Sequence, residues 1–156
     1  MKCSAAVLSV ALLLGSTAIA QSPSPSVEVY KSPTCGCCSK WVDHLRQHGF
    51  APRVTDLSDQ ALDQLKTKHG VPRTAQSCHT ALVGGYVVEG HVPAAEIRRL
   101  LKERPAVAGI AVAGMPLGSP GMEVAAAQAQ AYNVVAFDKQ GKVRVFSTHG
   151  PARQGL

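Results

Sequence analysis

The sequence has few aromatic residues and little acidic charge. Phe, Trp and Tyr make up 4% of the 156 residues, and 10 Asp and Glu stand against 16 Lys and Arg. The resulting net charge of +6 is modest and is spread along the chain. Nucleic-acid-binding proteins usually gather basic residues on one face and add aromatic side chains that stack on bases. We therefore expect no nucleic-acid partner.

Long apolar runs are also missing beyond residue 20, and a membrane-spanning helix needs about 20 apolar residues. The short apolar run over residues 5–14 follows the basic residue Lys2 and precedes Ala18-Ile19-Ala20, which fits the small-x-small cleavage rule. These features predict a secretory signal peptide over residues 1–20. We expect export to the bacterial periplasm, an oxidising compartment, with no membrane span after the signal is removed.

Cysteine is scarce, but its distribution is informative. Three of the five cysteines, Cys35, Cys37 and Cys38, fall within four positions, whereas Cys3 lies in the predicted signal peptide and Cys78 stands alone. This distribution does not match the spread disulfide framework of small secreted domains.

The cysteine cluster lies between a predicted strand and a predicted helix. Val27, Val29 and Tyr30 form a short run typical of a buried strand, and apolar residues recur at helical spacing from Cys38 until Gly49. The cysteines are therefore expected at a helix N-terminus. There the unpaired N–H groups and the helix dipole favour thiolate over thiol.

The cluster is compatible with more than one chemistry. Cys35 and Cys38 form a C-x-x-C pair, which is typical of thiol-disulfide oxidoreductases. Cys37 adds a third thiol that a single disulfide leaves unpaired, and clustered thiolates suit the soft ion Cu(I). A structural disulfide and a structural zinc site are further alternatives.

Strand and helix patterns alternate up to about residue 103. The order β-α-β-α-β-β-α indicates an α/β, thioredoxin-like domain, in which helices cover both faces of a small mixed sheet. After the first strand and helix, we expect a strand over residues 50–56, which Pro52 places at an edge of the sheet or at a strand beginning. We then expect a helix over 59–69 capped by Ser58, a hairpin over 80–89 that turns at Gly84-Gly85, and a helix that begins at Pro93.

This topology gives Cys78 a predicted place. The loop that enters the third strand passes beside the N-terminus of the first helix, so Cys78 is expected to meet residues 35–38. His79 adjoins Cys78, but strand alternation is expected to turn its side chain to the other face. His91 follows the hairpin and is open between a loop contact and a functional role.

Residues 105–122 alternate small apolar residues with Gly and Pro, which predicts a packed but irregular loop. Met115 and Met122 lie in this segment. Thioether sulfur is a suitable additional ligand for Cu(I), so both are candidate metal ligands. The alternative is that they fill the core, where methionine is common.

The C-terminal part predicts a short helix over residues 124–131 and then a hairpin. This hairpin either extends the sheet or packs under the methionine-containing loop. The domain organisation is a signal peptide over 1–20, a flexible leader over 21–26, one metal-binding domain with a C-terminal extension over 27–149, and a tail over 150–156.

Four segments carry recognisable motifs: residues 30–41 (YKSPTCGCCSKW), 77–81 (SCHTA), 89–94 (EGHVPA) and 114–123 (GMPLGSPGME). In combination they resemble the bacterial domain-of-unknown-function family 411, whose members include CopG-like copper-resistance proteins. The resemblance covers nearly all of the expected mature chain. It implies a periplasmic, thioredoxin-like protein that binds copper through Cys35, Cys37, Cys38 and Cys78.

Two functions therefore compete. In the first, the protein binds one or several Cu(I) ions and contributes to copper resistance or homeostasis, with copper redox activity as an extension. In the second, it is a thiol-disulfide oxidoreductase that uses Cys35 and Cys38. Cys37 and Cys78 favour copper binding, because a simple dithiol enzyme needs neither. Copper-handling or redox proteins of the periplasm are the expected partners, and an iron–sulfur site is a third hypothesis.

Overall fold

The structure is a computed structural model that describes residues 24–151. The predicted signal peptide, half of the predicted leader and most of the predicted tail lie outside the described residues. Within the described range, no helix has both the length and the apolar character needed to cross a bilayer.

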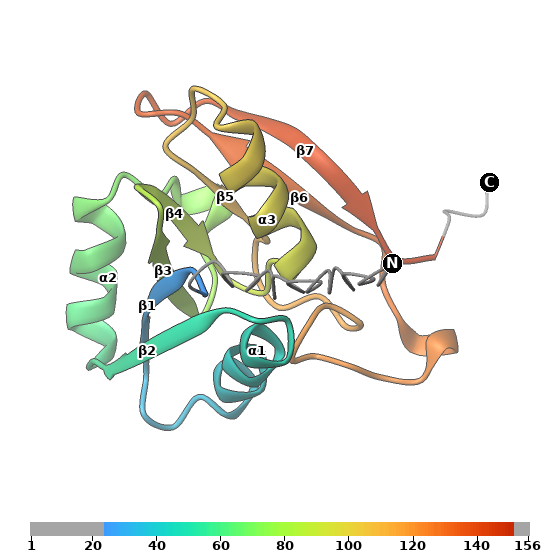
Figure 1. Ribbon diagram of the computed structural model, residues 1–156. Coiled ribbons are helices and arrows are strands. Elements are labelled where there is room, and N and C mark those ends of the chain that lie inside the picture. Colours follow the sequence, from blue (N-terminus) through green and yellow to red (C-terminus); the bar gives the residue numbers. More distant parts are fainter. Residues whose placement is uncertain (1–23, 152–156) are drawn as a thin grey trace, which may run out of the picture.

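Within residues 24–151 the fold contains seven strands and three α-helices (Figure 1). The α/β class is therefore confirmed, while the thioredoxin-like assignment stays a prediction. The elements are β1 (Ser26–Lys31), α1 (Gly36–Gln47), β2 (Ala51–Asp56), α2 (Asp59–Lys68), β3 (His79–Val83), β4 (Tyr86–Glu89), α3 (Ala94–Glu103), β5 (Gly109–Ala111), β6 (Tyr132–Phe137) and β7 (Val143–His149).

The strands form one mixed sheet in the order β2-β1-β3-β4-β5-β6-β7. The β1–β2 and β4–β5 pairs are parallel and the other neighbours are antiparallel. β2 lies at an edge, where Pro52 is tolerated, as predicted. The terminal hairpin β6–β7 extends the sheet through β5, which is one of the two predicted alternatives.

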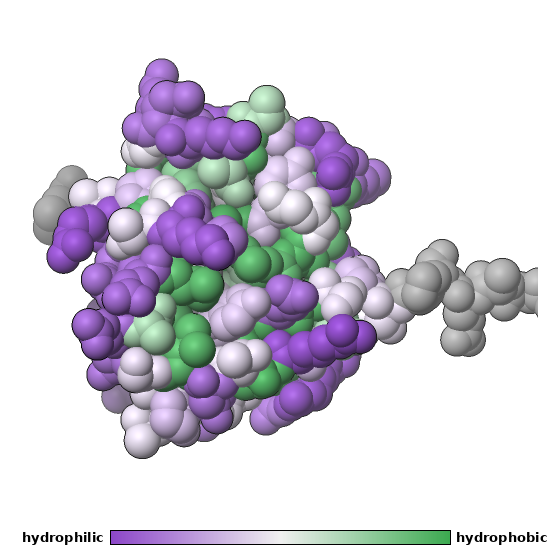
Figure 2. Space-filling view, turned by 90° about the vertical axis from the view of Figure 1, so that its left-hand side faces the viewer, coloured by the Kyte–Doolittle hydropathy of each residue, from purple (hydrophilic) through white to green (hydrophobic). Residues whose placement is uncertain are grey.

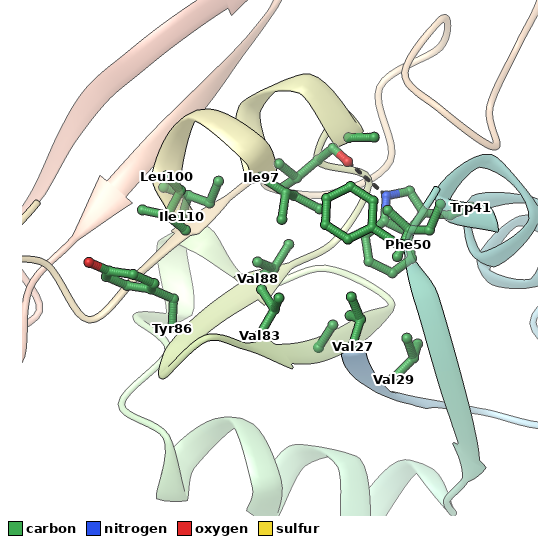
Figure 3. Close-up of a cluster of buried hydrophobic side chains, with 14 of the residues drawn as sticks. Val27, Val29, Trp41, Phe50, Val83, Tyr86, Val88, Ile97, Leu100 and Ile110 are labelled. Carbon is green, nitrogen blue, oxygen red and sulfur yellow. Dashed lines mark hydrogen bonds between the residues drawn. The ribbon is translucent and has the colours of Figure 1, made fainter. Parts of the chain in front are cut away.

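The larger core lies on the face of the sheet covered by α1 and α3 (Figure 3). Trp41 of α1 is fully buried, and its indole N–H donates a 2.9 Å hydrogen bond to the Val92 carbonyl. Burying an aromatic side chain of this size stabilises the fold by about 2–3 kcal/mol. This packing fixes α1, and with it the cysteine motif, against the sheet.

The structure confirms most of the helix ends and turns that were predicted from capping residues and glycines. Ser58 Oγ accepts the Ala61 N–H and caps α2, as predicted. Gly84 and Gly85 both have positive φ, which a two-residue hairpin turn requires. α1 begins at Gly36 with Cys35 as its N-cap, so the cysteines lie at the helix N-terminus, as predicted.

Two predictions for the C-terminal half are wrong in detail. β5 lies within the segment predicted to be irregular, because the missing side chain of Gly109 lets Val87 O and Phe137 approach from both neighbouring strands. The helix predicted over residues 124–131 is only a 3₁₀ turn, Ala126–Gln128. Alanine propensity alone does not stabilise so short a helix without a packing surface.

Candidate metal and thiol site

Four cysteine sulfurs meet where α1 begins and β3 begins. Cys35 caps α1, and Cys37 and Cys38 lie in its first turn. Cys78 directly precedes β3, which pairs with β1 so that His79 lies opposite Lys31, near the start of the loop that leads to Cys35. The four sulfurs all lie within 4.8 Å of one another.

Within this cluster, Cys35 and Cys38 form a disulfide, and Cys37 and Cys78 are free. Each free sulfur lies beside one sulfur of the disulfide: Cys37 Sγ is 3.5 Å from Cys35 Sγ, and Cys78 Sγ is 3.3 Å from Cys38 Sγ. The site is therefore in its oxidised form. Its reduction yields four neighbouring thiols.

Cys78 also contacts two buried histidines. Its sulfur lies 3.1 Å from His91 Nε2 and 3.4 Å from His79 Nδ1, and these three residues form a second group with metal-ligand spacing. His91 Nδ1 donates to the Pro120 carbonyl at 2.8 Å, so the ring presents its unprotonated Nε2 to Cys78. Burial lowers the pKa of His91.

Burial, followed by the nearby Cys37, raises the pKa of the Cys78 thiol to about 12. The thiol is therefore protonated in the metal-free protein, and it donates its hydrogen to His91 Nε2. This protonated state differs from the thiolate form in which a cysteine binds a metal ion.

The prediction that strand alternation turns His79 away from Cys78 is wrong. Its ring packs against Trp41 at 4.4 Å, on the α1 side of the sheet where the cysteines lie, and its Nδ1 is 3.4 Å from Cys78 Sγ. Alternation does not separate the two side chains, because Cys78 precedes β3 and is not part of the strand. Burial holds the pKa of His79 well below its usual value, and its buried Nε2 has no hydrogen-bond partner among the described residues.

The loop that contains both methionines covers one side of the cluster. Met115 Sδ lies 3.8 Å from Cys37 Sγ and its side chain is half exposed, while Met122 makes no such sulfur contact within residues 24–151. Gly121, with φ +85°, rests on α1, and a Cβ there would lie 2.7 Å from Cys37 O. The structure thus places one of the two candidate methionines beside the cysteines.

A buried ion pair that was not predicted from the sequence lies behind Cys78. Lys66 Nζ of α2 lies 2.5 Å from Glu89 Oε1 and donates to Thr80 Oγ1 at 2.9 Å. Glu89 also accepts the Ser77 N–H at 2.7 Å and the Thr80 hydroxyl at 2.6 Å. This network fixes the backbone immediately before Cys78. The cross-strand pairing of Thr80 with Glu89 in the predicted hairpin was the available signal.

Comparisons with known proteins agree with these features. The family described as "Protein of unknown function, DUF411" matches residues 75–122, a range that contains Cys78, His91 and Met115. The solved structure "Copper resistance protein copG- Form 1" is 39% identical, with a TM-score of 0.75, over 83% of this chain and 100% of its own. "Copper resistance protein copG- Form 2" is 41% identical, with a TM-score of 0.73, over 81% and 98%. No curated protein matches the sequence.

Proposed function

This chain belongs to the DUF411 family, with CopG proteins among its relatives, and from that premise we propose that it binds Cu(I) in the periplasm through Cys35, Cys37, Cys38 and Cys78. Such binding would limit free copper and contribute to copper resistance or homeostasis. The printed names of the two similar structures support the choice of copper.

The observation that carries the proposal is the meeting of four cysteine sulfurs within 4.8 Å, three from the N-terminal end of α1 and one from the residue that precedes β3. Thiolates are soft ligands and favour Cu(I), Zn²⁺ or iron–sulfur clusters over hard cations. Sulfurs this close are able to bridge ions, so the site suits more than one Cu(I).

Further ligands are available around the cluster. Met115 adds a thioether next to Cys37, and His91 presents an unprotonated ring nitrogen next to Cys78. His91 is held in this orientation by its bond to Pro120, as is common for metal-binding histidines. We include Met115 and His91 in the proposed site, and Met122 of the same loop is a candidate that substitution tests.

The disulfide makes copper binding depend on the redox state of Cys35 and Cys38. A sulfur in a disulfide is no thiolate, so the Cys35–Cys38 bond removes two of the four ligands. Copper loading and disulfide formation at this site therefore exclude each other. Reduction of the disulfide precedes full copper binding.

The same disulfide favours a second candidate function, thiol-disulfide exchange by Cys35 and Cys38. The pair lies at a helix N-terminus, where a thiolate is stabilised, and one of its sulfurs is accessible. Neither Cys37 nor Cys78 is needed for that reaction. The two candidate functions therefore differ in their dependence on Cys37 and Cys78.

The test compares the wild-type chain with a Cys37→Ser, Cys78→Ser variant, both reduced and loaded with Cu(I) without oxygen. Copper per chain and free thiols are measured together. We expect more than one copper per wild-type chain and loss of that copper in the variant. A wild-type protein that takes up no copper, with Cys35 and Cys38 still cycling between dithiol and disulfide in both proteins, would overturn copper binding in favour of the oxidoreductase.

A further inference from the structure

A groove opens beside the disulfide on the side of α2. Its volume is about 440 Å³, within the range of small-molecule pockets, which is about 300–1,000 Å³. Its lining includes Cys35 and Cys78 of the cysteine cluster and Asp59, Asp63 and Lys66 of α2. The groove is a different region from the side of the cluster that Met115 covers.

Only one sulfur of the disulfide is accessible from this groove. Cys35 lines the groove and is partly exposed, whereas Cys38 is fully buried and is not part of the lining. Thiol-disulfide exchange requires a thiolate to reach one sulfur of the disulfide. An incoming thiol therefore attacks Cys35 Sγ, and Cys38 is the leaving group.

The charges of the groove select among incoming thiols. Asp59 and Asp63 are exposed, and neither takes part in an ion pair within residues 24–151. The positive charge of Lys66 is offset by buried Glu89. The remaining polar groups of the lining are hydroxyls, an amide and the Cys78 thiol, so the part of the groove that α2 lines carries net negative charge. Figure 2, which views the α2 side, shows a largely hydrophilic surface around smaller hydrophobic areas.

We propose that this groove binds a small thiol with a positive charge next to its sulfur, and that this thiol reduces the Cys35–Cys38 disulfide. The thiolate attacks Cys35 Sγ, a mixed disulfide with Cys35 forms, and the electron pair of the broken bond leaves on Cys38 Sγ. A second small thiolate then attacks the sulfur of the small molecule in this mixed disulfide. This step releases the disulfide of the two small thiols and leaves Cys35 as a thiolate. Two small thiols are oxidised, one protein disulfide is reduced, and the two thiol protons pass to the protein thiols or to solvent.

This reaction would restore the four thiols that copper binding needs, but the exchange itself requires no copper. The test therefore uses the metal-free, oxidised full-length chain, so that it does not depend on the proposed copper site. Three reductants are compared: cysteamine, which is cationic, 2-mercaptoethanol, which is neutral, and 2-mercaptoethanesulfonate, which is anionic. Rate constants are expressed per thiolate, because the three thiols differ in pKa.

The groove variant is Asp59→Asn, Asp63→Asn. The matched control is Asp43→Asn, Glu103→Gln, which removes two exposed carboxylates that pair with exposed arginines outside the groove lining, and it changes the net charge equally. At low ionic strength, wild type and control are expected to react about five- to tenfold faster with cysteamine than with 2-mercaptoethanesulfonate. The groove variant is expected to lose most of this preference, with little change for 2-mercaptoethanol.

Two results would overturn the inference. One is that the wild type reacts no faster with cysteamine than with 2-mercaptoethanesulfonate, or that the groove variant keeps the same preference for cysteamine as the wild type. The other is a trapped mixed disulfide that peptide mapping assigns to Cys38 in place of Cys35. Unfolding curves of the variants confirm that each remains folded, since all four substituted residues are exposed.

Discussion

The two sides of Cys78 are built in different ways. On the α1 side lie Cys35, Cys37 and Cys38, which are near one another in sequence and include a reversible covalent bond. On the α2 side lie residues brought from several elements, Lys66, Thr80 and Glu89, which are buried and hydrogen-bonded to one another. The α1 side contains the disulfide, which opens and closes with the redox state, while the buried side holds Cys78 in a fixed position.

The largest effect is expected from breaking the buried side at Lys66. Lys66→Met leaves Glu89 buried without its ion-pair partner, which destabilises a protein by about 3–5 kcal/mol. Urea unfolding measures this loss. The control is Lys68→Met on the same helix, where the lysine is exposed and the expected change is below about 0.5 kcal/mol. Equal stability of the two variants would contradict a structural role for the ion pair.

The next effect concerns the histidine that faces Cys78. His91→Gln is expected to lower Cu(I) affinity about 10- to 100-fold, because the ring nitrogen and its bond to Pro120 are lost. Competition with a Cu(I) chelator measures the affinity. His69→Gln, at the C-terminal cap of α2, should leave the affinity unchanged. If both variants bind as wild type does, His91 is not a ligand.

A smaller effect is expected where the loop rests on α1. Gly121→Ala places a Cβ against Cys37 O and Trp41 N at a positive φ, and should cost about 1–3 kcal/mol. Gly114→Ala is the control, because it has a positive φ but no atom within 4 Å of the added Cβ. Its expected cost is the conformational strain alone, about 1 kcal/mol. Thermal or urea unfolding should separate the two variants.

The smallest effect is expected at the methionines. Met115→Leu keeps a similar volume but removes the thioether beside Cys37, and should lower Cu(I) affinity by less than about tenfold. Met122→Leu tests the other candidate of the same loop by the same chelator competition, and a smaller loss is expected because Met122 makes no sulfur contact with the cysteines within residues 24–151. An equal or larger loss for Met122→Leu would contradict the assignment of Met115 as the methionine ligand.

The α1 side was predictable from sequence, and the buried side largely was not. Helical spacing and a capping position are local properties, so the placement of Cys35 and Cys38 at a helix N-terminus followed from neighbouring residues. Cys78 needed the strand order as well, and its approach to the cluster depends on the predicted hairpin and on its pairing with β1.

Tertiary packing determines the rest. Lys66 falls on the buried face of α2, four residues after Leu62, and is stabilised there only because Glu89 meets it from β4. Two of the three residues of β5, Gly109 and Ala111, have low strand propensity, and the strand forms because both neighbouring strands pair with it. The difference between Met115 and Met122 follows from the path of a glycine-rich loop, which composition alone does not specify.

The central claim is that four thiols bind copper and that the disulfide prevents this. The most direct measurement is Cu(I) uptake, without oxygen, by fully reduced and fully oxidised samples of the same preparation, with free thiols counted in each. We expect more than one copper per chain in the reduced protein and strongly reduced uptake in the oxidised protein. Equal uptake by both samples would contradict the claim.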